Sequence, residues 1–139
     1  MSELKLDTQL CFALYSASNY LSQIYRSLLE QVDLTYTQFI VLMALGEEDN
    51  ISISALADRL GLTKATMTPL LRRLEQKQFI ERRIEAGNER QKNISLTATG
   101  QDLLASSGVD ITEQAFCNTG LSKTQAKDMI ALCKVITGK

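Results

Sequence analysis

The most constraining feature of the sequence is a pair of short apolar repeats separated by one glycine, in the stretch ISALADRLGLTKATMTPLLRRL at residues 53–74. On the N-terminal side, apolar residues recur at helical spacing up to Leu60, and Ser52 can cap this segment. Gly61 then allows the left-handed backbone that commonly ends a helix. Thr63 can cap a second segment with the same spacing. The pattern predicts two helices that cross closely and share a buried seam.

The second of these helices has one apolar side and one outward side. Its predicted inward positions are Met67, Leu70, Leu71 and Leu74. The outward positions in its first turns, where a DNA-reading helix contacts bases, are Lys64, Ala65, Thr66 and Thr68. An ordinary pair of packed helices uses the same glycine and the same apolar spacing, so this stretch alone leaves both interpretations open.

A predicted hairpin after the second helix favours the DNA-binding interpretation. Residues 79–84 and 92–96 are expected to form strands, joined by a turn at residues 85–91 that contains Gly87 and Asn88. A helix-turn-helix followed by a basic hairpin is a winged helix. The basic residues of the hairpin would face phosphates or the minor groove, and they are Arg82, Arg83, Arg90 and Lys92. Arg72 and Arg73 on the second helix are expected nearer to phosphates.

The net charge of −1 argues superficially against nucleic acid, but the charges are segregated along the chain. Residues 1–50 carry two Lys/Arg and seven Asp/Glu, a net of −5, whereas residues 51–92 carry nine and five, a net of +4. Residues 93–139 carry four of each and balance. Because the basic charge coincides with the predicted winged helix, we expect double-stranded DNA as its partner and weaker binding as salt rises.

The helices predicted on both sides of the winged helix carry more apolar surface than it can cover. With 139 residues and 45% hydrophobic content, the chain can bury one sizeable core, so we expect one domain over residues 1–139. The winged helix would occupy about residues 35–97, and the flanking helices about residues 7–31 and 98–137. Asp7 can cap the first flanking helix. The predicted fold class is mainly α, an α+β winged helix-turn-helix. Burial of the flanking helices against a second copy predicts a two-fold homodimer.

The composition also excludes several kinds of function. No apolar run approaches the roughly 18 residues of a membrane span and no signal peptide is visible, so we expect a cytoplasmic protein without a membrane partner. The absence of histidine excludes imidazole acid–base catalysis, and the three cysteines are too widely spaced for a zinc finger. We therefore expect no metal, no cofactor and no enzymatic activity. An odd cysteine count leaves packing or redox chemistry as roles for these residues.

The chain resembles the MarR transcriptional regulators over essentially its whole length. The segments LTKATMTPLLRRLEQKQFIERR and NERQKNISLTATG carry this resemblance. Within the family, LCFALYSAS near the N-terminus and LTYTQFIVLMAL are similar to the OhrR branch, whose members sense organic hydroperoxides through a cysteine. Two positions depart from that branch: Asn88 replaces a common aspartate in the wing, and Gly46 replaces a tryptophan near the sensor.

The resemblance assigns the sensing role to Cys11. In the OhrR branch, tyrosine hydroxyls hold the cysteine, and the matching residues here are Tyr15, Tyr25 and Tyr36. Dimers of this branch bring the first two tyrosines from the other subunit, and the family also places a wing-tip arginine, matched by Arg90, in the minor groove. Cys11 lies early in its predicted helix, where the helix dipole favours a thiolate.

The resulting hypothesis is a redox-sensing repressor of the two-cysteine type. The reduced dimer would bind an inverted-repeat operator, and organic hydroperoxide would oxidise Cys11 to a sulfenic acid that a second thiol captures as a disulfide. The resemblance favours Cys117 of the partner subunit, beside the turn at residues 118–120, and assigns Cys133 to packing. Cys133 and a small cellular thiol remain open as alternative resolving thiols. Oxidation would release the operator.

Three alternatives remain open at this point. A free cysteine is usually a small buried hydrophobe, which would make Cys11 a packing residue. A MarR-type repressor released by a small phenolic or other ligand would have the same winged helix, with Cys11 incidental. A thiol peroxidase would use Cys11 catalytically, but a basic winged helix has no role in such an enzyme.

Overall fold

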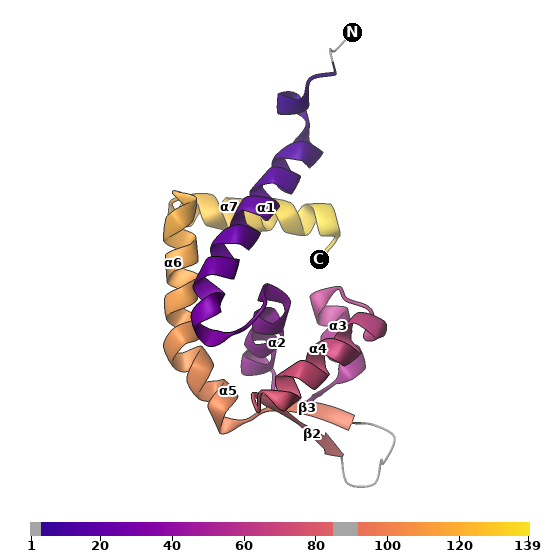
Figure 1. Cartoon of the computed structure of the whole chain (residues 1–139). Helices are drawn as coiled ribbons and strands as arrows, with labels where there is room; N and C mark the ends of the chain where they lie inside the picture. The colour runs from indigo at the N-terminus through magenta and orange to yellow at the C-terminus, as the bar shows by residue number, and fades with distance from the viewer. Residues whose placement is uncertain (1–3, 85–91) are drawn as a thin grey trace.

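The computed structural model describes residues 4–84 and 92–139, and most of these residues are helical (Figure 1). The helices are α1 (Leu10–Leu29), α2 (Tyr36–Glu47), α3 (Ile53–Leu60), α4 (Lys64–Gln76), α5 (Ala98–Leu103), α6 (Val109–Thr119) and α7 (Lys123–Thr137). The strands are β1 (Ile51–Ser52), β2 (Ile80–Ile84) and β3 (Lys92–Leu96). Short 3₁₀ turns lie at Leu6–Thr8 and Glu30–Val32, and a π turn lies at Leu104–Gly108. The predicted class, a mainly α winged helix-turn-helix, is confirmed.

Local capping forms the helix-turn-helix as the sequence predicts. The amide of Ala55 donates to Ser52 Oγ over 3.1 Å and starts α3, which ends at Gly61 with a left-handed φ of 68°. The amide of Thr66 donates to Thr63 Oγ1 over 3.2 Å and starts α4. These bonds satisfy amides that a helix start otherwise leaves without partners. The two helices therefore begin and end at residues whose chemistry specifies those positions.

The core is built around α2 and the inward side of α4. All four predicted inward residues of α4 are buried: Met67, Leu70, Leu71 and Leu74. The apolar run of α2 is also mostly buried, through Phe39, Val41, Leu42, Ala44 and Leu45. A helix that is apolar on most of its circumference must be covered on most sides, and α2 contacts α1, α3, α4 and β3. The helix-turn-helix thus packs directly onto α2.

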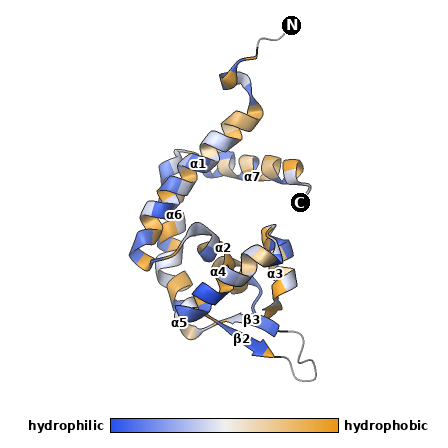
Figure 2. Ribbon diagram, turned by 45° about the vertical axis from the view of Figure 1, so that its right-hand side comes forward, coloured by the Kyte–Doolittle hydropathy of each residue, from blue (hydrophilic) through white to orange (hydrophobic). Residues whose placement is uncertain are grey.

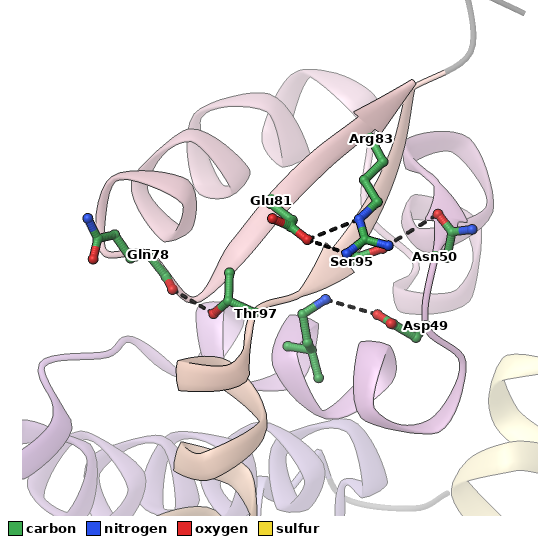
Figure 3. Close-up of polar contacts among 8 residues, drawn as sticks. Asp49, Asn50, Gln78, Glu81, Arg83, Ser95 and Thr97 are labelled. Carbon is green, nitrogen blue, oxygen red and sulfur yellow. Dashed lines mark hydrogen bonds and ion pairs between the residues drawn. The ribbon is translucent and has the colours of Figure 1, made fainter. Parts of the chain in front are cut away.

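The wing is an antiparallel sheet in the order β1-β3-β2. The predicted strands β2 and β3 pair with Ile80 opposite Leu96. The two-residue strand β1 was not predicted. Beside it, Asp49 Oδ1 accepts the Leu96 amide over 2.9 Å, which fixes β3 to the loop after α2 (Figure 3). The predicted turn at residues 85–91, with Asn88 and Arg90, lies outside the described residues.

The first flanking helix differs from the prediction in its start. It begins after Gln9 without a side-chain cap, and Asp7 lies in the preceding 3₁₀ turn, so the predicted cap at Asp7 is wrong. The segment after Thr97 is interrupted by the π turn Leu104–Gly108, at the Ser-Ser-Gly sequence of residues 106–108 that favours such an interruption, before it continues as α6 beside α1. Thr97 and Ser122 cap the helices that follow them.

Apolar side chains remain exposed on α7 and on the first half of α1, which extends past the other elements (Figures 1 and 2). The large exposed apolar residues of these two helices are Leu10, Tyr15, Tyr20, Met129, Ile130, Leu132, Val135 and Ile136. Within residues 4–84 and 92–139, no single helix is long and apolar enough to cross a membrane. Only the pair formed by α1 with its 3₁₀ extension and by α2 reaches that length and composition, and these two helices are bent by 75° where they meet.

Candidate functional site

The outward side of α4 presents the residues expected to contact bases. Lys64, Ala65, Thr66 and Thr68 are all exposed. Thr68 Oγ1 donates to the Lys64 carbonyl over 3.0 Å, and the hydroxyls of Thr66 and Thr63 lie 3.0 Å apart. Both hydroxyls that face outward are thereby oriented by the helix itself and keep acceptor capacity for an external donor.

A basic groove lies between α4 and the wing. Arg72 from α4, Arg82 from β2 and Lys92 from β3 line one cavity of about 540 Å³, together with Glu75 and Gln76. Arg82 Nε donates to Glu75 Oε2 over 2.8 Å, which holds the guanidinium against α4. The structure therefore brings together three of the cations that the sequence assigned to DNA contact.

The other predicted cations lie elsewhere. Arg83 follows Arg82 on β2, so its side chain leaves the opposite face of the sheet, where it donates to Glu81 Oε1 over 2.6 and 3.0 Å (Figure 3). Arg73 lines a different cavity from Arg72, on the side of α4 that faces α1 and α2. Arg90 is outside the described residues. The predicted set thus divides between two sides of α4 and two faces of the wing.

A tyrosine pair forms the second feature of interest. The rings of Tyr25 and Tyr36 lie 4.7 Å apart at 50°, at a cavity of about 280 Å³ between α1, α2 and α7. Burial raises the pKa of both hydroxyls, and the neighbouring Tyr36 raises the pKa of Tyr25 further. Both hydroxyls are protonated near neutral pH, as tyrosines ordinarily are, and are available as hydrogen-bond donors. Cys133 of α7 lines the same cavity.

Cys11 lies far from the tyrosine pair within one chain, although Leu14, one turn after it on α1, lines the near end of the same cavity. It is exposed on the projecting part of α1, and Tyr25 follows it by 14 residues on the same helix. At about 1.5 Å per residue, these positions are about 21 Å apart along the helix axis. Tyr15 lies one turn after Cys11 and is also exposed. One chain therefore cannot bring Cys11 to Tyr25 or Tyr36, although Tyr15 is within reach.

The structure also places residues near the tyrosine pair that the sequence did not place there. Cys133, the less favoured resolving thiol, is exposed and lines the same cavity as the tyrosine pair, and all three cysteines are free thiols. Arg26 and Lys77 line the cavity that contains Arg73. Spacing along α7 puts Met129 and Cys133 on one helical face, but only the tertiary packing determines what that face meets.

A capped helix-turn-helix, a wing fixed to it and a basic groove between them define a winged-helix protein. Comparisons with known proteins identify the family. The MarR family model matches residues 34–92. SarZ of Staphylococcus saprophyticus, an HTH-type transcriptional regulator, is 38% identical over 124 residues, which cover 89% of this chain and 84% of SarZ. The chain belongs to the MarR family of transcriptional regulators.

Two further proteins are similar to this chain. The HTH-type transcriptional regulator TtmR of Methylorubrum extorquens is 45% identical over 98 residues, which cover 70% of this chain but only half of TtmR. AbfR of Staphylococcus epidermidis has been solved on DNA in its reduced form and in its overoxidised form, with 30% identity. The reduced form superposes with a TM-score of 0.79 over 96% of this chain and 90% of that chain, and the overoxidised form with 0.77 over 96% and 93%.

Proposed function

We propose that this chain is a redox-sensing transcriptional repressor that binds an inverted-repeat operator as a two-fold dimer and leaves it when Cys11 is oxidised. The observation that carries the proposal is the separation of Cys11 from the tyrosine pair within one chain. The thiol lies on an exposed, projecting helix and the hydroxyl donors lie in an open cavity, so each chain holds both halves of a sensor that only two chains can complete.

Dimerisation is supported by the apolar surface of the same elements. Side chains on α7 and on the projecting half of α1 are too large and too numerous to remain in water without cost. A second copy would cover them with the same residues, as two-fold interfaces do. In such a dimer the projecting half of α1 enters the partner, which is the route by which Cys11 would reach the partner's tyrosine cavity.

The tyrosine hydroxyls supply the chemistry that a reactive cysteine needs here. A thiolate in an apolar cavity is favoured only if donors or cations offset its burial. Tyr25 and Tyr36 are protonated donors near neutral pH, as tyrosines ordinarily are, and burial raises their pKa values further above that range. By resemblance to the OhrR branch, Tyr25 and Tyr15 of one subunit would hydrogen-bond the Cys11 sulfur of the other, with Tyr36 beside Tyr25 as a third donor.

The oxidation proceeds in two balanced steps. The Cys11 thiolate attacks the distal oxygen of an organic hydroperoxide, the O–O bond breaks, and the alkoxide takes a proton and leaves as the alcohol, so that sulfur is oxidised to a sulfenic acid. The thiol of Cys117 from the other subunit then attacks the sulfenic sulfur, and the products are a disulfide and water. Cys117 lies at the exposed end of α6, beside the left-handed Gly120.

Disulfide closure would act on DNA binding through the helices that carry the two sulfurs. The α carbons of bridged cysteines lie at most about 7 Å apart, so α1 and α6 must approach each other across the dimer. Because α6 continues through the π turn and α5 into the wing, this movement would rotate the two winged helices out of groove register. The DNA contacts would be the outward residues of α4, the basic groove, Arg73, Arg83 and the wing residue Arg90.

The similarity to AbfR favours a release step that depends on the disulfide, and not on oxidation of the cysteine sulfur alone. AbfR has been solved on DNA both reduced and overoxidised. Sulfur in a sulfinic or sulfonic acid cannot form a disulfide. A protein that still occupies DNA with overoxidised sulfur is therefore consistent with a release step that depends on the cross-link.

A second candidate function rests on the tyrosine cavity itself. Its volume of about 280 Å³ and its mostly apolar lining would also suit a small phenolic ligand, with Tyr25 and Tyr36 as hydrogen-bond partners. In that case Cys11 would have no part in release. Thermal-shift responses to phenols in the Cys11→Ser protein would support this candidate.

The decisive experiment measures operator affinity and cross-linking in the same samples. Reduced and cumene-hydroperoxide-treated protein would be titrated onto labelled operator DNA and run on non-reducing gels. Wild type should release the operator and form a linked dimer, whereas Cys11→Ser and Cys117→Ser should form no linked dimer and stay bound. Cys133→Ser is the matched control and should behave as wild type. Release of Cys11→Ser by peroxide would refute the proposal, and loss of the linked dimer in Cys133→Ser alone would transfer the resolving role to Cys133.

A further inference from the structure

The side chain of Lys77 connects the recognition helix to the corner between α1 and α2. Lys77 is the residue at which α4 ends. Its Nζ donates to the backbone carbonyl of Asp33, lies 3.4 Å from Gln38 Oε1 and lies 3.7 Å from Asp33 Oδ2. We propose that Lys77 is a positioning residue that transmits displacement of the tyrosine corner to α4. This inference rests on the proposed redox function and names the link by which the sensor acts on DNA binding.

The corner that receives Lys77 is closely defined. Asp33 has a left-handed φ of 54°, and its amide donates to Glu30 O over 3.2 Å, while the Leu34 amide donates to Leu29 O over 3.3 Å. A non-glycine residue holds this backbone only when its surroundings specify it. Its carbonyl therefore has a fixed direction, and Lys77 binds an oxygen that cannot move without the corner.

The second acceptor of Lys77 is part of the cap of α2. Gln38 is only 3% exposed, and its Oε1 also accepts the Thr35 amide over 3.0 Å, while Thr35 Oγ1 accepts the Gln38 amide. One buried amide oxygen thus serves both the start of α2 and the end of α4. A shift of this cap changes a hydrogen bond of the recognition helix directly.

The same cap holds a sensor tyrosine. Tyr36 is the first residue of α2, directly after Thr35, and its ring packs against that of Tyr25 in a tilted arrangement. Tyr36 and Ser22 line both the tyrosine cavity and the adjacent cavity of about 410 Å³ that contains Lys77. The two cavities therefore share a wall, and a new group seated against Tyr36 would press on the turn to which Lys77 is bound.

The hydrogen bond that Glu75 of α4 accepts from Arg82 leads to the wing and not to the tyrosine corner, and the apolar contacts of α4 give it less direction. Its inward side chains are held by apolar packing, which is roughly proportional to area and carries no preferred direction. Lys77 stands at one end of a helix whose other end, Lys64, is about 20 Å away at about 1.5 Å per residue. A displacement at Lys77 would reach the base-contacting end through the helix backbone, in which Pro69 removes one hydrogen bond.

The exposed carboxylate of Asp33 contributes little to this link. Its side chain is 97% exposed, against 30% for that of Lys77, and an ion pair so open to water is weak. The backbone carbonyl and the buried Gln38 oxygen make the connection. Asp33→Asn therefore removes the ion pair while it keeps the carbonyl, and asparagine tolerates the left-handed backbone. This substitution is a matched control for loss of the lysine.

The test compares operator affinity in the reduced and the peroxide-oxidised states, on operator DNA selected with the reduced wild type. The quantity of interest is the ratio of the oxidised to the reduced Kd. In Lys77→Met this ratio should fall at least about fivefold, because the oxidised variant stays bound to the operator. A fivefold change is the lower end of typical allosteric coupling. Lys77→Arg and Asp33→Asn should keep the wild-type ratio. Lys77→Gln, too short to reach the corner, serves if the methionine variant does not fold.

The outcomes of these titrations separate failure of the Lys77 inference from failure of the proposed redox function. An unchanged ratio in Lys77→Met, even with weaker binding in both states, would make Lys77 a structural contact and overturn the inference. An equal loss in Asp33→Asn would also overturn it, because the exposed ion pair would then be the link. Wild-type protein that peroxide does not release would instead refute the proposed redox function.

Discussion

Substitution of Gly100 by alanine should destabilise the protein, because it disrupts the packing of the wing against the helix that follows it. Gly100 lies in the first turn of α5, where its amide donates to the cap hydroxyl of Thr97 over 3.1 Å. The Thr97 amide donates to the Phe79 carbonyl over 3.0 Å, which brings this turn against the start of β2. A Cβ at Gly100 would lie 2.3 Å from the Phe79 oxygen and 3.1 Å from Leu96 Cδ2.

The cost follows from what the new methyl group meets. A carbonyl oxygen of the backbone cannot rotate away as a side-chain end can, so β2 or α5 must shift. Overpacking of this kind costs about 1–3 kcal/mol, and a contact with backbone falls near the upper end. Replacing a helical glycine returns about 0.5–1 kcal/mol. The expected net loss in the free energy of unfolding is therefore about 2 kcal/mol for Gly100→Ala.

Gly46 provides the matched control because it is also a helical glycine. Its Cβ would lie 3.0 Å from Leu104 Cδ1, the free end of a flexible side chain beside a cavity of about 380 Å³. Gly46→Ala should therefore be neutral or stabilising by up to about 1 kcal/mol. Urea unfolding followed by circular dichroism measures both variants. Equal stabilisation by the two substitutions would refute the close approach of α5 to Phe79.

Two further predictions concern the tyrosine pair and the basic groove. Folding raises the pKa of Tyr25 and of Tyr36, so their neutral hydroxyls stabilise the folded state. This stability is fully present below their ordinary pKa of 10.0 and is lost as pH rises through the raised values. Urea titrations above pH 10 should therefore show a steeper loss of stability in wild type than in the Tyr25→Phe/Tyr36→Phe protein. Arg72→Ala should weaken binding to all DNA sequences alike and reduce the slope of log K against log salt by about 1, whereas Lys64→Ala should cost about 1–3 kcal/mol on the operator and relax base preference. A sequence-specific effect of Arg72→Ala in the same titrations would contradict its placement on phosphates.

The helix-turn-helix was predictable because its determinants are local. Ser52, Gly61 and Thr63 act on backbone groups within four residues, and the apolar spacing of α4 needs no knowledge of the rest of the chain. The strands β2 and β3 were also predictable, since alternation and a turn with glycine define them. β1 was not, because two residues carry no period and its pairing with β3 joins positions 43 residues apart, such as Ile51 and Ile94.

The site was predictable by residue type and less so by arrangement. The sequence selects cationic positions, but neighbours on a helix leave it about 100° apart, so Arg72 faces the wing groove and Arg73 faces α1 and α2. Lys77 gains its role from a corner 44 residues earlier in the chain. Cys133 faces the tyrosine pair only because α7 folds back across α1. Such contacts follow from tertiary packing, which a local pattern does not contain.

The π turn between α5 and α6 constrains the number of residues that can connect these two helices. A π turn holds one residue more than an α-helical turn, so every later side chain is rotated by about 100°. That rotation lets one continuous rod carry the wing at its start and still present Ile111 and Ala115 to the interior. Loss of a single residue, such as the exposed Ser106, would restore the α-helical register and turn that apolar face outward. Over evolution, the exposed residues of this turn, Ala105 and Ser106, can be exchanged, but a one-codon deletion would require α6 to acquire a new buried face.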